Sequence, residues 1–210
     1  MIRVVLADDH QLIREGLKKI FREEPDLNVV CEAGTATEIF NFLRSSDADV
    51  LVLDVNMPGR SGIDILSDLR KEFQQIHILM LSMHPEDALA VRALRSGASG
   101  YITKNAPPTE IITAVRKVAS GRKYVSESLA EQLVDAARSP AGQDLHRQLS
   151  DREFEVFQLL GSGKTVTEIA GLLSLSVPTV STYRARILEK LNMHSTAEII
   201  HYAVRNKLVE

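Results

Sequence analysis

Five short apolar runs alternate with amphipathic segments over residues 1–120, and this alternation constrains the fold more than any other feature of the chain. The runs are rich in Val, Ile and Leu and mostly lack a two-residue period, which is typical of strands covered on both faces. They occupy residues 2–7, 27–33, 49–55, 76–82 and 99–104. The segments with helical periodicity occupy residues 12–23, 35–45, 61–72, 86–96 and 107–120. This order predicts an α/β fold: a doubly wound five-stranded parallel sheet with helices on both faces.

The pattern changes after Gly121, and no further strand is predicted. One helix is expected at 126–138, and the Ser-Pro-Ala-Gly segment at 139–142 indicates a break. Four more helices are expected at residues 151–161, 165–173, 177–191 and 195–205. Ser150 and Glu153 have the spacing of a capping box. The predicted parts are therefore an α/β domain at 1–121, a linker with one helix at 122–147 and a small all-α domain at 148–210.

The length and composition allow two ordinary domains. A chain of 210 residues is long enough for two separate cores. No apolar run reaches the length of a transmembrane helix and the N-terminus lacks the features of a secretory signal, so a cytoplasmic protein without membrane contact is expected. Cys31 is the only cysteine, which excludes a disulfide within the chain. The net charge is −3. Any affinity for nucleic acid must therefore come from the local placement of cations.

Three carboxylates fall at predicted strand ends, with Asp8 and Asp9 closing the first strand and Asp54 closing the third. The carboxyl ends of parallel strands lie on one edge of a sheet, so these acids are expected to converge there. Clustered like charges are costly without a cation, and Mg²⁺ suits a site with few carboxylates and several waters. The backbone carbonyl of Asn56 is a further candidate ligand.

Two more strand ends place Ser82 and Lys104 on the same edge. Acids, a hydroxyl and an ammonium around one point suit phosphoryl transfer, with Asp54 as the nucleophile. Magnesium and Lys104 would neutralise the phosphoryl oxygens, and Ser82 would donate to one of them. Each residue taken singly is more simply a helix cap, a turn residue or a solvated lysine. Their occurrence together at strand ends favours a site.

Four segments resemble, in order and spacing, the receiver domain of two-component response regulators. They are ADDH (7–10), LDVNMPGRSG (53–62), LS (81–82) and GYITK (100–104). The resemblance implies a flavodoxin-like receiver, magnesium as its cofactor and a cognate sensor histidine kinase as its partner. The residues it implies are the acidic metal ligands Asp8 and Asp9, the phosphoacceptor Asp54, the switch hydroxyl Ser82, the phosphate-pairing Lys104 and the switch aromatic Tyr101.

The segment 165–191 has the pattern of a helix-turn-helix: a first helix, a tight turn and a second helix with polar and basic residues outside its apolar stripe. The apolar stripe is predicted to comprise Ile169, Ala170, Leu172, Leu173, Val180, Ile187, Leu188 and Leu191. The predicted DNA-binding residues are Lys164, Thr165, Ser176, Thr179, Ser181, Thr182, Arg184, Arg186 and Lys190. Among these, Ser181, Thr182 and Arg184 are expected to face the bases. Charge alone would favour an ordinary solvated helix face.

Residues 148–210 resemble the LuxR-type domain of NarL/FixJ response regulators, and the STYR segment at 181–184 is similar to the GacA, EvgA and BvgA branch. The shared elements include Glu168-Ile169-Ala170, Thr179-Val180 and Lys190-Leu191. The pattern of the last helix places Ile199, Ile200, Ala203 and Val204 at exposed or half-exposed positions. The resemblance implies that this helix, through Ile199, Ile200 and Ala203, pairs two copies on DNA. Packing within one domain is an alternative that is compatible with pairing.

The whole pattern predicts a phosphorylation-dependent, DNA-binding regulator of transcription in a bacterial two-component system, and not an enzyme. Phosphorylation of Asp54 by the kinase or a small phosphodonor would draw in Ser82 and Lys104 and turn Tyr101 inward. The altered surface at 86–120 would then favour a homodimer or release the C-terminal helices, and so control binding to promoter DNA.

Two other classes of protein remain as alternatives. A phosphohydrolase with an aspartate nucleophile would need a second acid two residues after Asp54, where Asn56 stands. A signalling adaptor would use the helical domain to bind protein. Salt-dependent binding to DNA separates both from a regulator of transcription.

Overall fold

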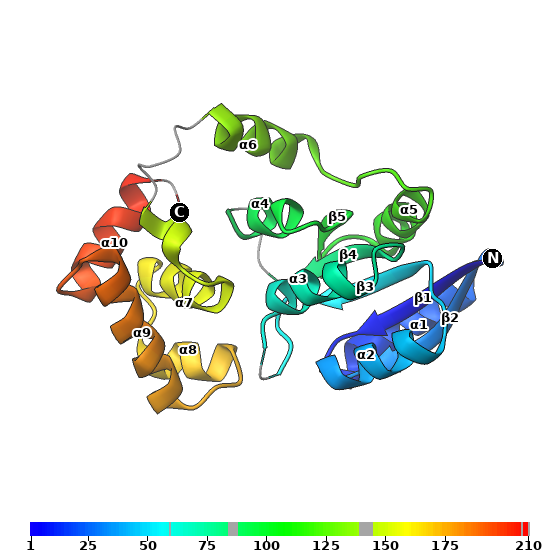
Figure 1. Cartoon of the computed structure of the whole chain (residues 1–210), viewed down its shortest axis with the longest axis horizontal. Coiled ribbons are helices and arrows are strands. Elements are labelled where there is room, and N and C mark those ends of the chain that lie inside the picture. The colour runs from blue at the N-terminus through cyan, green and yellow to red at the C-terminus, as the bar shows by residue number, and fades with distance from the viewer. Residues whose placement is uncertain (59, 84–87, 139–144, 207, 210) are drawn as a thin grey trace. The chain divides into compact units, whose positions relative to one another are not determined.

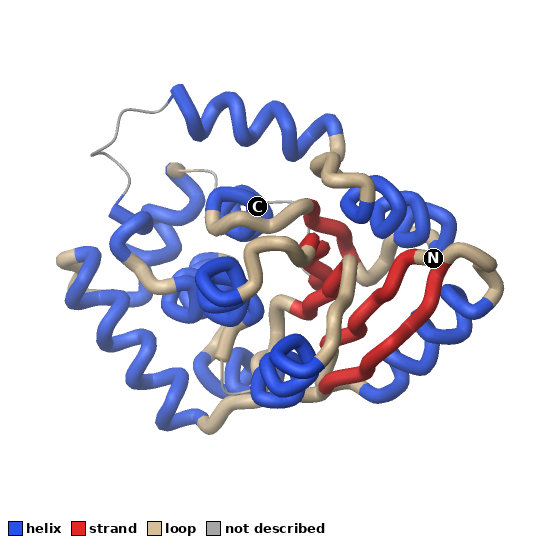
Figure 2. The backbone as a smooth tube through the Cα atoms, turned by 45° about the vertical axis from the view of Figure 1, so that its right-hand side comes forward, coloured by secondary structure: helices blue, strands red, loops and turns tan. Residues whose placement is uncertain are grey.

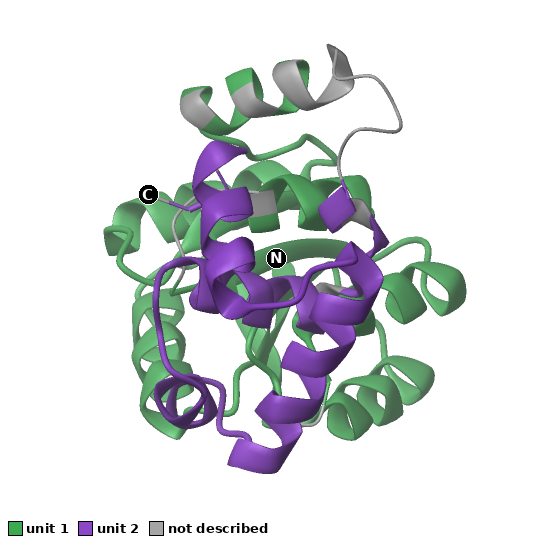
Figure 3. Cartoon of the chain, turned by 90° about the vertical axis from the view of Figure 1, so that its left-hand side faces the viewer, with its two compact units in different colours: residues 1–137 green, residues 138–210 purple. Residues whose placement is uncertain are grey.

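The computed structural model describes residues 1–58, 60–83, 88–138, 145–206 and 208–209. They form two compact units, residues 1–137 and 138–210 (Figure 3). Among the described helices, none is both long and apolar enough to cross a membrane. The predicted break at 139–142 lies outside the described residues, and the predicted domain limits at 121 and 147 stay a prediction.

A five-stranded sheet forms the centre of the first unit, with the strand order β2-β1-β3-β4-β5 and parallel pairing throughout (Figure 1). The strands are β1 (Ile2–Ala7), β2 (Leu27–Ala33), β3 (Val50–Asp54), β4 (His77–Ser82) and β5 (Gly100–Thr103). The helices are α1 (Gln11–Arg22), α2 (Ala36–Ser45), α3 (Gly62–Glu72), α4 (Ala88–Arg95) and α5 (Pro108–Ala119). The predicted doubly wound sheet is confirmed.

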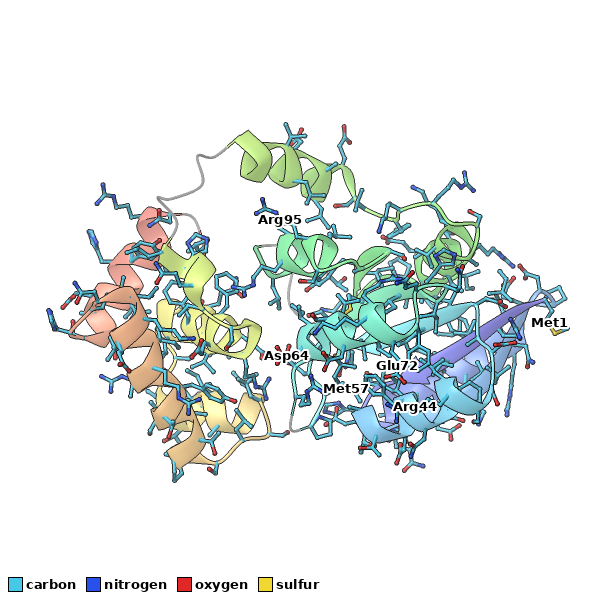
Figure 4. The ribbon with its side chains drawn as sticks, in the orientation of Figure 1. Met1, Arg44, Met57, Asp64, Glu72 and Arg95 are labelled. Atoms are coloured by element: carbon cyan, nitrogen blue, oxygen red, sulfur yellow. The ribbon has the colours of Figure 1, made fainter. Side chains whose placement is uncertain are left out.

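Helices cover both faces of the sheet (Figure 2). On one face, Phe21 of α1 and Val115 of α5 pack in a core cluster with alternate strand residues such as Val52. Strand residues that point the other way, including Leu51 and Leu53, are also fully buried. On that second face, Arg44 of α2 and Glu72 of α3 point toward one another and pair at 2.6 Å (Figure 4). Burial on both sides explains why the strands read as continuous apolar runs.

The first residue of α3, Gly62, lies tightly against the end of β3. Its backbone N–H donates to the carbonyl of Val55 at 2.7 Å. A Cβ at this position would lie 2.1 Å from the carbonyl oxygen of Asp54. The close approach of α3 to the end of β3 therefore requires glycine.

We expect Gly62→Ala to lower the free energy of unfolding by about 1–3 kcal/mol, because the backbone must move to accept the methyl group. Gly16 is the matched control, since it lies within α1 and an added Cβ would meet nothing within 4 Å beyond the adjoining backbone of its own helix. Gly16→Ala should raise the free energy of unfolding by about 0.5–1 kcal/mol. Urea denaturation followed by circular dichroism measures both, and a change of the same sign would contradict this interpretation.

The chain after α5 stays packed against the sheet edge. Tyr124 forms a parallel bridge with Gly100, and its N–H donates to the carbonyl of Ser99 at 2.9 Å. Its hydroxyl donates to Glu110 at 2.7 Å. The helix α6 (Glu127–Arg138) follows. The start of the predicted linker therefore packs as part of the first unit.

The described part of the second unit is helical. It comprises the 3-10 helix η1 (Leu145–Gln148) and the helices α7 (Asp151–Gly161), α8 (Val166–Leu172), α9 (Val177–Leu191) and α10 (Thr196–Arg205). The predicted capping box of Ser150 and Glu153 is confirmed. A second box, formed by Thr165 and Glu168 before α8, was not predicted.

Three predictions about side-chain burial in the second unit are wrong: two residues expected at the surface are buried, and one expected inside is exposed. Ile199 and Ala203 are fully buried, because α10 packs against α7 where Gly161 leaves room for the Ala203 side chain. Leu172 is 56% exposed, because Ile169 and Leu173 occupy the inner positions of that turn. The outer face of α10 instead carries the half-buried Ile200 and the exposed Val204.

Candidate functional site

The centre of the site is a lysine between two buried acids. Lys104 Nζ lies 2.6 Å from Asp8 Oδ2 and 2.7 Å from Asp54 Oδ2. The three side chains are 5%, 2% and 0% exposed, respectively. In this low-dielectric setting the attraction between the charges is much stronger than at the surface.

Strand register brings these residues together. Ala7 of β1 pairs with Leu53 of β3. The next residues of the two segments, Asp8 and Asp54, therefore lie at the same level of the sheet. Ser82 pairs with Thr103, and the N–H of Lys104 donates to the carbonyl of Ser82 at 2.7 Å. The expected convergence of strand ends on one edge is thus what the structure shows.

The pKa values of Asp54 and Lys104 are both raised, but for different reasons. Burial raises the pKa of Asp54, the charge of Lys104 opposes that rise, and the charge of Asp8 adds to it, so the pKa lies above its usual value. Burial lowers the pKa of Lys104, but attraction to Asp54 and Asp8 outweighs burial and leaves it raised. Burial therefore favours the protonated form of Asp54, whereas the two nearby acids favour the protonated form of Lys104.

The donor atoms fit a divalent cation. Among the described residues, one ligand atom from each of Asp8, Asp9, His10 and Asp54 lies within 4.8 Å of the others. Asn56 donates its backbone N–H to Asp54 Oδ1 at 3.1 Å. Its side-chain Oδ1 is buried without a hydrogen-bond partner in the described part of the chain. Such an orphaned oxygen beside carboxylates suits a hard cation. The sequence interpretation missed His10, although the residue directly follows the two acids.

Ser82 and Tyr101 are both fully buried. Ser82 ends β4, beside the strand that carries Asp54. The Tyr101 side chain already faces inward, so the inward turn expected on phosphorylation is not a change from this structure. The roles of both residues as switch elements stay predictions.

Most predicted DNA-binding residues cluster at the starts of α8 and α9 or on the outer face of α9. Ser176 caps α9, and its Oγ accepts from the N–H of Thr179 at 3.2 Å. Thr165 caps α8, and Lys164 precedes it on the surface. The predicted DNA-binding residues that are exposed along α9 are Ser181, Thr182, Arg186 and Lys190.

Two of the predicted cations have partners within the second unit. Arg184 is half-buried, and its Nε donates to Thr196 Oγ1 of α10 at 2.8 Å. Lys190 Nζ donates to Glu153 Oε2 of α7 at 2.6 Å. Each of these contacts spans two helices, so both residues hold the unit together as well as being candidates for DNA contact.

Comparison with known proteins defines the family. Residues 4–116 match the response regulator receiver domain, and residues 147–203 match bacterial regulatory proteins of the luxR family. The chain belongs to the response regulators that combine these two domains. Members of this family are DNA-binding regulators of transcription rather than enzymes, so that prediction is confirmed and the phosphohydrolase alternative is dropped.

Individual relatives match over nearly the whole chain. The response regulator UvrY of Escherichia coli (strain K12) is 34% identical over 209 residues, which is 99% of this chain and 96% of UvrY. The oxygen regulatory protein NreC of Staphylococcus carnosus is 36% identical over 216 residues, which cover 100% of this chain and 100% of NreC. Among solved structures, a match is RcsB of Salmonella enterica serovar Typhimurium bound to promoter rprA in the presence of the phosphomimetic BeF3⁻. The two structures superpose with a TM-score of 0.65 at 28% identity, and the match covers 96% of this chain and 97% of the RcsB chain.

Proposed function

We propose that Asp54 accepts a phosphoryl group from a sensor histidine kinase and that phosphorylation controls dimerisation and binding to promoter DNA. The observation that carries this proposal is the position of Asp54. It is a fully buried carboxylate at the end of a central strand, held 2.7 Å from the Lys104 ammonium. The titles of related RcsB structures report complexes with DNA and with a phosphomimetic. Because promoter DNA is its proposed target, we propose that the protein acts in the cytoplasm.

The transfer step follows from the site. An Asp54 oxygen attacks phosphorus, the new P–O bond forms as the P–N bond to the kinase histidine breaks, and the nitrogen keeps the electron pair. Lys104 then pairs with a phosphoryl oxygen, and Ser82 is placed on the same edge to donate to another. Asp8, Asp9, Asp54 and Asn56 are the proposed residues that hold Mg²⁺, which when bound neutralises phosphoryl charge.

Selection of genomic DNA fragments by the full chain, with and without a small phosphodonor, tests the function. We expect a limited set of fragments to be enriched, more strongly after phosphorylation, and binding to weaken as salt rises. Absence of DNA binding in either state would favour the protein-binding adaptor instead.

Arg184 is the predicted base-contacting residue whose environment is best defined. We expect Arg184→Ala to weaken specific binding by about 1–3 kcal/mol if its guanidinium reads a base. Gel shifts on the selected fragment and on random DNA measure this effect. Equal losses on both would assign Arg184 to a phosphate contact.

Thr196→Val is the matched control, because it removes the partner of Arg184 in α10 while keeping the guanidinium. If Thr196→Val weakens specific binding as much as Arg184→Ala, the arginine acts by holding α10 and does not read a base.

A further inference from the structure

We propose that His10 supplies a nitrogen ligand to the cation at the acidic pocket and biases this site toward divalent transition metals over Mg²⁺. The inference rests on the metal site of the proposed function and concerns one residue that the proposed set of oxygen ligands does not include.

The backbone directs the His10 side chain onto the carboxylates. His10 is the residue before α1, with extended backbone angles (φ −85, ψ 103), and its side chain does not cap the helix. Its N–H donates to Asp8 Oδ1 at 2.8 Å, which closes a tight turn. The ring nitrogen Nδ1 consequently lies 2.8 Å from Asp9 Oδ1 and 3.1 Å from Asp8 Oδ1.

Without an ion these contacts are those of a hydrogen bond or ion pair, and the same separations also fit neighbouring ligands on one ion. An octahedral cation with bonds of about 2.1 Å places adjacent donor atoms about 3.0 Å apart and opposite ones about 4.2 Å apart. The distances from Nδ1 to the two carboxylate oxygens, 2.8 and 3.1 Å, lie on either side of the separation expected for adjacent donors. The candidate ligand atoms of all four residues lie within 4.8 Å of one another, which leaves room for the separation expected for opposite donors. The His10 side chain is 61% exposed and Asp9 is 24% exposed, so these two residues lie at the open side of a pocket in which Asp8 and Asp54 are buried.

The donor type determines which cation is favoured. Carboxylate and carbonyl oxygens suit Mg²⁺ and Mn²⁺, whereas imidazole suits later transition metals such as Ni²⁺, Cu²⁺ and Zn²⁺. With Nδ1 toward the ion, the proton lies on Nε2, which faces water. One nitrogen among oxygen donors should therefore strengthen transition-metal binding and leave Mg²⁺ binding to the carboxylates.

Electron paramagnetic resonance of Mn²⁺ added to the full chain tests the inference. We expect bound Mn²⁺ to show ¹⁴N coupling from imidazole. His10→Asn should abolish that coupling, because the Asn side chain offers an oxygen near the Nδ1 position. The same variant should weaken Zn²⁺ binding about tenfold while changing Mg²⁺ binding much less. His194→Asn, at an exposed histidine of the second unit, should change neither.

Three results would overturn the inference. Bound Mn²⁺ without ¹⁴N coupling, or coupling that survives in His10→Asn, removes His10 as a ligand while leaving the oxygen site intact. Binding that is unaffected by Asp9→Asn places the ion elsewhere and also removes the metal from the proposed function.

Discussion

Asp54→Asn should leave the chain folded and abolish the response of DNA binding to a phosphodonor. An amide has no nucleophilic oxygen comparable to a carboxylate, so no acyl phosphate forms. Coupling between two sites is typically about 1–3 kcal/mol, so phosphorylation should raise the affinity for DNA roughly 5–150-fold. The variant should lose all of this increase. Gel shifts on a selected fragment with and without phosphodonor measure the effect.

Stability gives this variant an independent check. Folding raises the pKa of Asp54. The ionised carboxylate therefore costs its full share of stability above the folded-state pKa, and this cost shrinks as the pH falls from that value to the lower pKa of the unfolded chain. In EDTA at pH 7, Asp54→Asn should be at least as stable as the wild type, and its stability should depend less on acidification.

Asp47→Asn is the control, since Asp47 precedes β3 at the opposite end and is 89% exposed. It should leave the phosphodonor response unchanged. A full response in Asp54→Asn would remove Asp54 from its proposed role.

The first unit could be predicted from sequence because one physical rule governs both its fold and its site. Strands buried on both faces read as continuous apolar runs, and parallel strands end on one edge. The positions of Asp8, Asp54 and Lys104 follow from these two facts. His10 was missed because it lies in the loop beyond the strand, where the backbone angles that turn its ring toward the acids are not visible in a pattern.

The second unit shows where periodicity fails. Two adjacent apolar stripes lie on α10, one with Ile199 and Ala203 and the other with Ile200 and Val204. A helical period cannot decide which stripe faces α7, and the small side chain of Ala203 against Gly161 decides it in the structure. The Arg184 to Thr196 contact likewise depends on how α9 and α10 pack.

The same packing changes which residues are proposed to pair two copies. A buried side chain cannot contact a second molecule without disturbing its own unit. Ile199 and Ala203 therefore hold α10 in place, while Ile200 and Val204 lie with Ala197, His201 and Arg205 along a shallow groove on the outer face. The predicted dimerisation through this helix stays a prediction, now centred on Ile200 and Val204.

Lys104→Met should separate phosphorylation from its consequence. The variant keeps Asp54 and the acids around it, so an alkali-labile acyl phosphate can still form on Asp54. Without the ammonium that now lies 2.7 Å from Asp54, the phosphoryl oxygens lose this buried cation, and the increase in DNA affinity should be lost. Labelling with radioactive phosphodonor and gel shifts on the same sample measure the two steps.

The variant should also be less stable by about 3–5 kcal/mol in EDTA, because it leaves Asp8 and Asp54 buried without their shared cation. Lys71→Met is the matched control, since Lys71 is 75% exposed and pairs with Asp68 on the surface of α3, where such a pair contributes about 0–1 kcal/mol. Added Mg²⁺ should restore part of the stability lost in Lys104→Met and none of the smaller loss in Lys71→Met, because a cation bound by the acids replaces the missing charge only in the pocket.

Two outcomes would contradict this prediction. Equal losses of stability in the two variants would mean that the buried lysine contributes no more than a lysine in a surface ion pair. A normal DNA response in Lys104→Met would place the phosphate-pairing cation at another residue.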